Sequence, residues 1–101
     1  MIEGVKIDVS SAELEQHLRE RVAHHGERTE FYRGQVDALR EGGVGQQAAT
    51  NDPISSLEQS AKHHADRAAF FRFLADHVVP KQTYRLSEQD LTRIEVIGRY
   101  L

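Results

Sequence analysis

The residues in this chain best suited to chemistry occur in two copies of one short pattern. Two adjacent histidines are followed by a carboxylate, an arginine and a pair of aromatic residues in His24–Tyr32, and the same order returns in His63–Phe71. Neutral imidazole is the commonest protein ligand for transition metals, and carboxylates can bind the same ions. One chemistry that this repeat indicates is therefore a metal site to which both copies contribute.

Six residues are candidate ligands for a divalent transition metal: His24, His25, Glu27, His63, His64 and Asp66. One helix alone would supply too few of them, because a transition metal normally takes about four ligands. The structural alternative is that the inner histidine of each pair packs in the core and bonds to polar neighbours. The sequence has no Glu-x-x-His, the motif of ferritin-like carboxylate bundles. The core interpretation is therefore favoured, with metal binding as the alternative.

Other titratable residues follow one another at steps of three and four, which places them on one helix face. They are Glu13, His17, Glu20, His24 and Glu27. Such residues could hold a divalent ion where two chains meet. A histidine three residues before a glutamate is also an ordinary surface pair, worth roughly 0.2–0.5 kcal/mol. We interpret this stripe as a solvated helix surface.

Two long helices must position these residues. Apolar residues recur at three- and four-residue steps over 11–40 and again over 53–79, as in helices that pack along their whole length. A capping box at Ser10–Glu13 opens the first helix, and Asp52–Pro53 opens the second. A glycine-rich loop over 41–52 joins them, so we expect an antiparallel hairpin.

The two apolar seams also predict how the helices of the hairpin face each other. In the pairing that sets large residues opposite small ones, His25 faces Ala68 and His64 faces Thr29. The two inner histidines then lie about one helical turn apart along the hairpin axis. The arginine of each copy is expected to pair with the carboxylate of the other copy and so brace the hairpin.

Shorter segments flank the hairpin. Val5, Ile7 and Val9 alternate with polar residues, so residues 1–10 are expected to form an extended arm that lies on the helices. Tyr84 and Leu86, which follow the second predicted helix in the sequence, are expected to pack back on the hairpin.

The C-terminal segment has its own helix signal. Ser87–Asp90 is a second capping box and predicts a helix over 87–99. Residues 93–98 also alternate between apolar and polar types, which leaves a strand there as the alternative.

Two glycines lie inside the first predicted helix. Gly26 and Gly34 each cost up to about 1 kcal/mol relative to alanine at such positions. They mark either the close approach of another backbone or a tolerated weakness of the helix.

The second predicted helix has more aromatic surface than one seam can cover. We predict that this excess is an interface, formed by Phe70, Phe71, Phe73 and Leu74. A second copy of the chain is the natural partner, because two hairpins can pair into a four-helix bundle. The fold class expected is therefore a single all-α domain that forms a homodimer.

Composition limits the function classes. The chain has 101 residues, a net charge of −3 and no cysteine, so neither nucleic-acid binding nor thiolate chemistry is indicated. The N-terminus has no signal-peptide pattern and no segment has the length of a membrane span, so a cytoplasmic protein is expected. Without a recognisable catalytic motif, we expect a non-enzymatic assembly or adaptor protein that binds itself or another protein through helix faces. A ferritin-like metal-binding bundle is the alternative.

Overall fold

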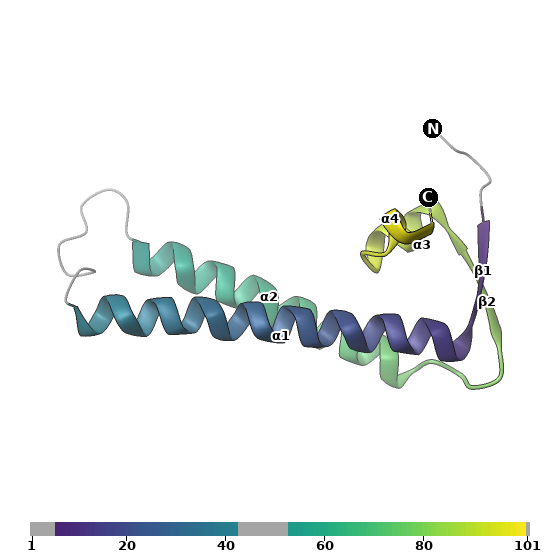
Figure 1. Cartoon of the computed structure of the whole chain (residues 1–101), viewed down its shortest axis with the longest axis horizontal. Helices are drawn as coiled ribbons and strands as arrows, with labels where there is room; N and C mark the ends of the chain where they lie inside the picture. Colours follow the sequence, from purple (N-terminus) through teal and green to yellow (C-terminus); the bar gives the residue numbers. More distant parts are fainter. Residues whose placement is uncertain (1–5, 43–52, 101) are drawn as a thin grey trace. The chain divides into compact units, whose positions relative to one another are not determined.

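The computed structural model describes residues 6–42 and 53–100, and most of them are helical (Figure 1). In chain order, the elements are β1 (Lys6–Ser10), α1 (Ser11–Glu41), α2 (Pro53–Asp76), β2 (Thr83–Ser87), α3 (Glu88–Arg93) and α4 (Ile97–Tyr100). The two long helices pack as a hairpin, which confirms that part of the predicted fold. Most of the predicted 41–52 loop and the first half of the N-terminal arm lie outside the described residues.

The chain divides into two compact units, which we treat separately. The terminal unit holds the chain up to Val22 and from Phe70 onward, and the central unit is Ala23–Ala69. Both long helices contribute to both units. In the central unit, Arg40 Nη2 lies 3.0 Å from Glu58 Oε2 while residues earlier in α1 meet later residues of α2, so the helices run antiparallel.

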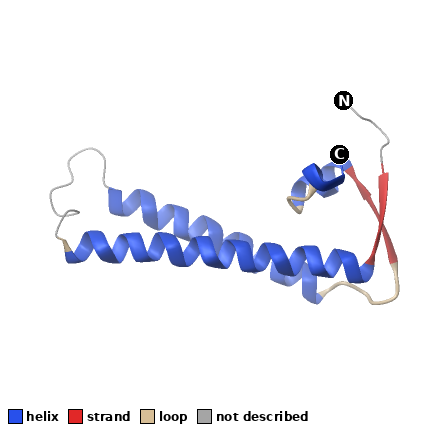
Figure 2. Cartoon of the chain, viewed as in Figure 1, coloured by secondary structure: helices blue, strands red, loops and turns tan. Residues whose placement is uncertain are grey.

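The fold is mostly helical, as predicted, but it is not all-α, because β1 and β2 pair as an antiparallel ribbon (Figure 2). The register sets Lys6 opposite Ser87 and Val9 opposite Tyr84. Pairing satisfies the backbone of the extended arm, which could not be stable alone. The alternation of Tyr84 and Leu86 with polar residues was a sequence signal for this second strand.

The first turn of α1 follows directly from β1. Ser10 Oγ accepts a hydrogen bond from the backbone N–H of Glu13 at 3.2 Å, as the predicted capping box requires. The carboxylate of Glu13 takes a different partner, the hydroxyl of Tyr100. The N-terminal end of α1 is thus tied both to the strand before it and to the C-terminal helix.

The second long helix is shorter than expected at its C-terminus. It ends at Asp76, whereas the sequence predicted a helix to residue 79. The next N–H, that of His77, bonds to the carbonyl of Leu74 at 3.1 Å and tightens the last turn. Lys81 then has a φ of 61°, in the left-handed region, as the chain turns into β2.

The C-terminal segment forms two short helices in place of the single predicted one. The predicted capping box opens α3, with reciprocal bonds between the side chains and backbones of Ser87 and Asp90. Glu95 has a φ of 62°, which breaks the helix before α4 begins. The alternative strand over 93–98 is wrong, since turns and α4 occupy those residues.

The terminal unit contains the larger apolar core. Its buried side chains come from both long helices, from β1 and from the C-terminal segment, and they are Val9, Leu14, Leu18, Phe71, Ala75, Leu91, Ile94 and Val96. Phe71 and Leu91 are completely buried, with 0% of their surface exposed. At about 1.5–3 kcal/mol for each large apolar side chain buried, this core holds the segments of the terminal unit together.

Candidate functional site

The two histidine pairs meet in the central unit. His25 Nδ1 lies 2.7 Å from His64 Nδ1, so one ring donates a hydrogen and the other accepts it. The ring centre of His24 lies 5.0 Å from that of His25, and His63 and His64 are 5.1 Å apart. We call these four residues the histidine cluster.

The predicted partners of the inner histidines need correction. Thr29, expected to satisfy a histidine across the hairpin, donates its hydroxyl to the carbonyl of His25 on its own helix at 2.8 Å. The inner histidines instead bond to each other. His25 is only 4% exposed, so its position is that of a core histidine.

The arginine of the first copy lies close to the cluster. Arg28 Nη2 donates to the Tyr32 hydroxyl at 2.9 Å, and its guanidinium lies 4.9 Å from the Phe31 ring centre. The Tyr32 ring in turn stacks on His64 at 5.6 Å and 12°. Asp66, the predicted partner of Arg28 across the hairpin, bonds to Lys62 at 2.8 Å.

One histidine of the cluster has a shifted pKa. Burial lowers the pKa of His64, because loss of water disfavours imidazolium. Positive charge on His25 and His63, and then on Arg28, lowers it further. Charged groups of the first copy of the repeat therefore lower the pKa of His64 in the second copy.

The predicted histidine ligands lie close together, but the predicted carboxylate ligands do not complete a metal site with them. Within residues 6–42 and 53–100, no group of three or more His, Cys, Asp or Glu side chains is arranged to hold an ion. Glu27 is exposed, and Asp66 is bonded to a lysine. Metal binding by both copies stays a prediction, and it would require an ion to replace the hydrogen shared by His25 and His64.

A further histidine is buried in the terminal unit. His17 is 4% exposed, and its Nε2 lies 2.7 Å from the Tyr100 hydroxyl. That hydroxyl donates to Glu13 Oε1 at 3.0 Å, while Arg99 Nη1 bonds to His17 Nδ1. Arg99 Nη1 also lies 3.2 Å from His17 Nε2, so both Arg99 and Tyr100 contact the buried ring.

This hydrogen-bonded chain corrects the interpretation of the titratable stripe. His17 is not on a solvated surface, because its ring lies against the α4 residues Arg99 and Tyr100. The side chains of Glu13 and Glu20, by contrast, are each 48% exposed. Glu20 extends the contact, with its carboxylate 3.8 Å from Arg99 Nη2. Burial first, and then the bond to Glu13, raise the pKa of Tyr100, so its phenol is a neutral donor rather than a nucleophile. No local sequence signal could link residues this far apart.

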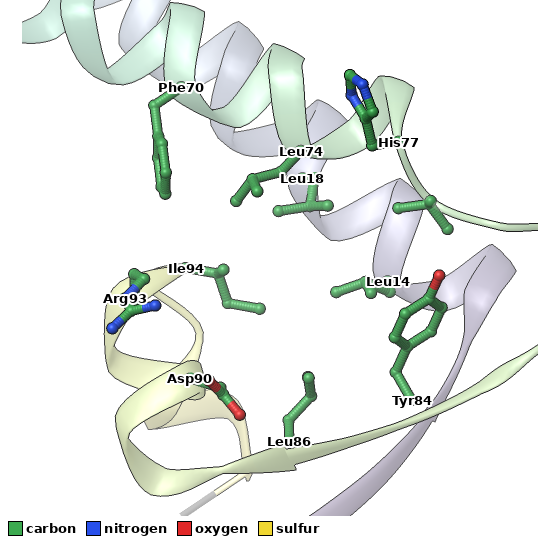
Figure 3. Close-up of a pocket in the computed structure, with 11 residues that line it drawn as sticks. Leu14, Leu18, Phe70, Leu74, His77, Tyr84, Leu86, Asp90, Arg93 and Ile94 are labelled. Atoms are coloured by element: carbon green, nitrogen blue, oxygen red, sulfur yellow. The ribbon is translucent and has the colours of Figure 1, made fainter.

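The terminal unit has an open apolar groove of about 330 Å³ (Figure 3). Its apolar lining comes from α1, α2, β2 and the residue that follows α3, and includes Leu14, Leu18, Phe70, Leu74, Leu86 and Ile94. Asp90 and Arg93 lie on its α3 wall. The Asp90 carboxylate already accepts the backbone N–H of Ser87 at 2.9 Å. The groove is therefore better suited to apolar contact than to a reaction.

The four residues predicted as an interface have different positions in the structure. Phe71 is completely buried in the core, which excludes it from any interface of this folded chain. Phe70 and Leu74 are half-buried and line the groove. Phe73 is 60% exposed. An interface at these last three residues stays a prediction.

Comparisons of this chain with protein families, with curated proteins and with solved structures gave no match. In the part of the chain that the structure describes, no helix has both the length and the apolar character needed to cross a bilayer. Function must therefore be argued from the geometry of the described residues.

Proposed function

We propose that this protein is a small non-enzymatic assembly or adaptor protein that acts through contacts of its helix faces with another protein chain, first of all a second copy of itself. The observation that carries the proposal is the open apolar groove of the terminal unit, together with the exposed side chains of Phe73 and Val79. These two residues are 60% and 53% exposed and adjoin the lining residues Leu74 and Val78 in the chain. Apolar surface gathered in this way marks a binding surface, because water contact with it is unfavourable.

Gel filtration with light scattering tests this proposal. The wild-type protein should give twice the 11.5 kDa mass of one chain and dissociate on dilution. Val79→Glu places a charge on the exposed apolar surface and should shift the protein towards monomer. Gln35→Glu makes the same charge change at an exposed polar position and should leave the mass unchanged.

A single 11.5 kDa species at every concentration would contradict the proposal. Equal dimer fractions in both variants would show that the chains associate through a different surface.

A further inference from the structure

Phe73 is the most exposed large apolar side chain in the described part of the terminal unit, with 60% of its surface exposed. Its ring centre is 4.2 Å from that of His77, whose side chain lines the groove. His77 Nδ1 donates its hydrogen to the Phe73 carbonyl at 2.7 Å. This bond fixes the orientation of the imidazole ring. Phe73 and His77 together thus form an aromatic projection next to the apolar groove.

We infer that Phe73 of one chain occupies the groove of a second copy, and that the second copy's Phe73 occupies the groove of the first. This inference rests on the proposed function and names the contact that produces self-association. A twofold dimer requires the same patch on both chains to be self-complementary. The exposed Phe73 ring and the groove meet that requirement, because each of two copies can place its ring in the groove of the other.

The volume of the groove fits this occupant. A cavity of about 150 Å³ lined by leucine, isoleucine and phenylalanine is enough to hold benzene. The groove, at about 330 Å³ and with a lining of the same residue types, has room for the Phe73 ring and for a second apolar side chain such as Val79.

The charges beside the projection and the groove also match. Phe73 is flanked by the exposed residues Arg72 and Asp76, and the α3 wall of the groove has Asp90 and Arg93. Asp76 already bonds to Arg19 at 3.1 Å, so the charges left to match are Arg72 beside Phe73 and Asp90 on the groove wall. A twofold contact can bring Arg72 of each chain towards Asp90 of the other, which favours the second copy over an uncharged small molecule.

The area available predicts a weak dimer. Two phenylalanine rings bury about 300–500 Å² together, at about 150–250 Å² each. Stable interfaces bury at least about 1,200 Å² in total. The apolar residues around the groove must supply the remainder, so the association should be reversible on dilution.

Paired variants test the contact. Phe73→Ala removes the projection from an exposed position and leaves the groove intact, while Leu86→Trp fills the groove from β2 and leaves the projection intact. Each variant alone should lose at least tenfold in dimer affinity by sedimentation equilibrium. Mixing the two should restore part of it, because the mixed dimer keeps one intact contact. Phe31→Ala, at a half-exposed ring of the central unit, is the control and should dimerise like the wild type.

The other outcomes overturn the inference and identify which proposal fails. Wild-type affinity in Phe73→Ala, or no gain on mixing, would remove the groove contact while leaving a dimer that uses another surface. A wild-type protein that is monomeric throughout would remove the proposed function as well. A monomer whose groove binds the apolar dye ANS, with loss of that binding in Leu86→Trp, would make the groove a small-molecule site instead.

Discussion

Neighbouring histidines in each copy of the repeat have different surroundings. Successive residues in a helix are about 100° apart, so adjacent side chains point in different directions. His24 is exposed while His25 is buried, and His63 is exposed while His64 is partly buried. Each inner histidine bonds to the other across the hairpin, and each outer one contributes ring contact at the surface.

The burial of His64 next to other positively charged groups makes stability depend on pH. The pKa of His64 is lowered in the folded chain, chiefly by burial and then by positive charge on His25. The unfolded chain therefore binds this proton more readily, and stability is lost as pH falls from the unfolded pKa of about 6.5 through the lower folded value. If both rings were protonated, each Nδ1 would have a hydrogen and the bond between them could not exist.

Urea unfolding between pH 8 and pH 5 should show this loss in the wild type and a flatter profile in His64→Leu. His63→Gln, at the exposed histidine next to it, removes only a lesser contribution and should keep most of the pH dependence. An unchanged profile in His64→Leu would mean that other groups control the acid response.

At the scale of the elements, the short C-terminal helices hold the terminal unit together. Arg21 donates to Glu95 Oε1 through two nitrogens, at 3.0 and 2.7 Å, just before α4 begins. Both side chains are about one-quarter exposed, at 28% and 27%, so the pair is partly shielded from water. Together with the buried bonds of His17, it fixes a helix of only four residues that would not be stable alone.

The two glycines of α1 give a direct test of what lies against this helix. A Cβ atom added at Gly26 or Gly34 would meet nothing within 4 Å among residues 6–42 and 53–100. Alanine there should therefore stabilise the protein by about 0.5–1 kcal/mol at each position, because it removes backbone freedom from the unfolded state.

Denaturant unfolding of Gly26→Ala, Gly34→Ala and the double variant checks this prediction. Additive gains would mean that the α1 surface at both positions is open in solution. A loss of stability at either one would mean that another backbone packs there, the alternative that the sequence left open.

At the scale of the whole molecule, self-association should appear in the thermal stability. A partner that binds only the folded state stabilises it in proportion to the logarithm of its concentration. The melting temperature of the wild type should therefore rise with protein concentration in scanning calorimetry. Phe73→Ala should reduce that slope, and a melting temperature independent of concentration would count against a dimer.

Local signals in the sequence predicted the helical hairpin, the N-cap bond of Ser10 and the capping box of Ser87. These features depend on residues within a few positions of one another, such as seam residues three or four apart and a hydroxyl close to a free N–H. The same signals also place Phe71 in a seam, although they do not separate it from the neighbouring Phe70 and Phe73 that have other roles.

Only the tertiary structure decided the rest. The pairing of β1 with β2, the bond between His25 and His64 and the burial of His17 under Tyr100 join residues that are far apart in the chain. No periodicity specifies such contacts, because they depend on how side chains from different elements fill shared space. The groove has the same origin, since its walls come from four elements and form only when these pack together.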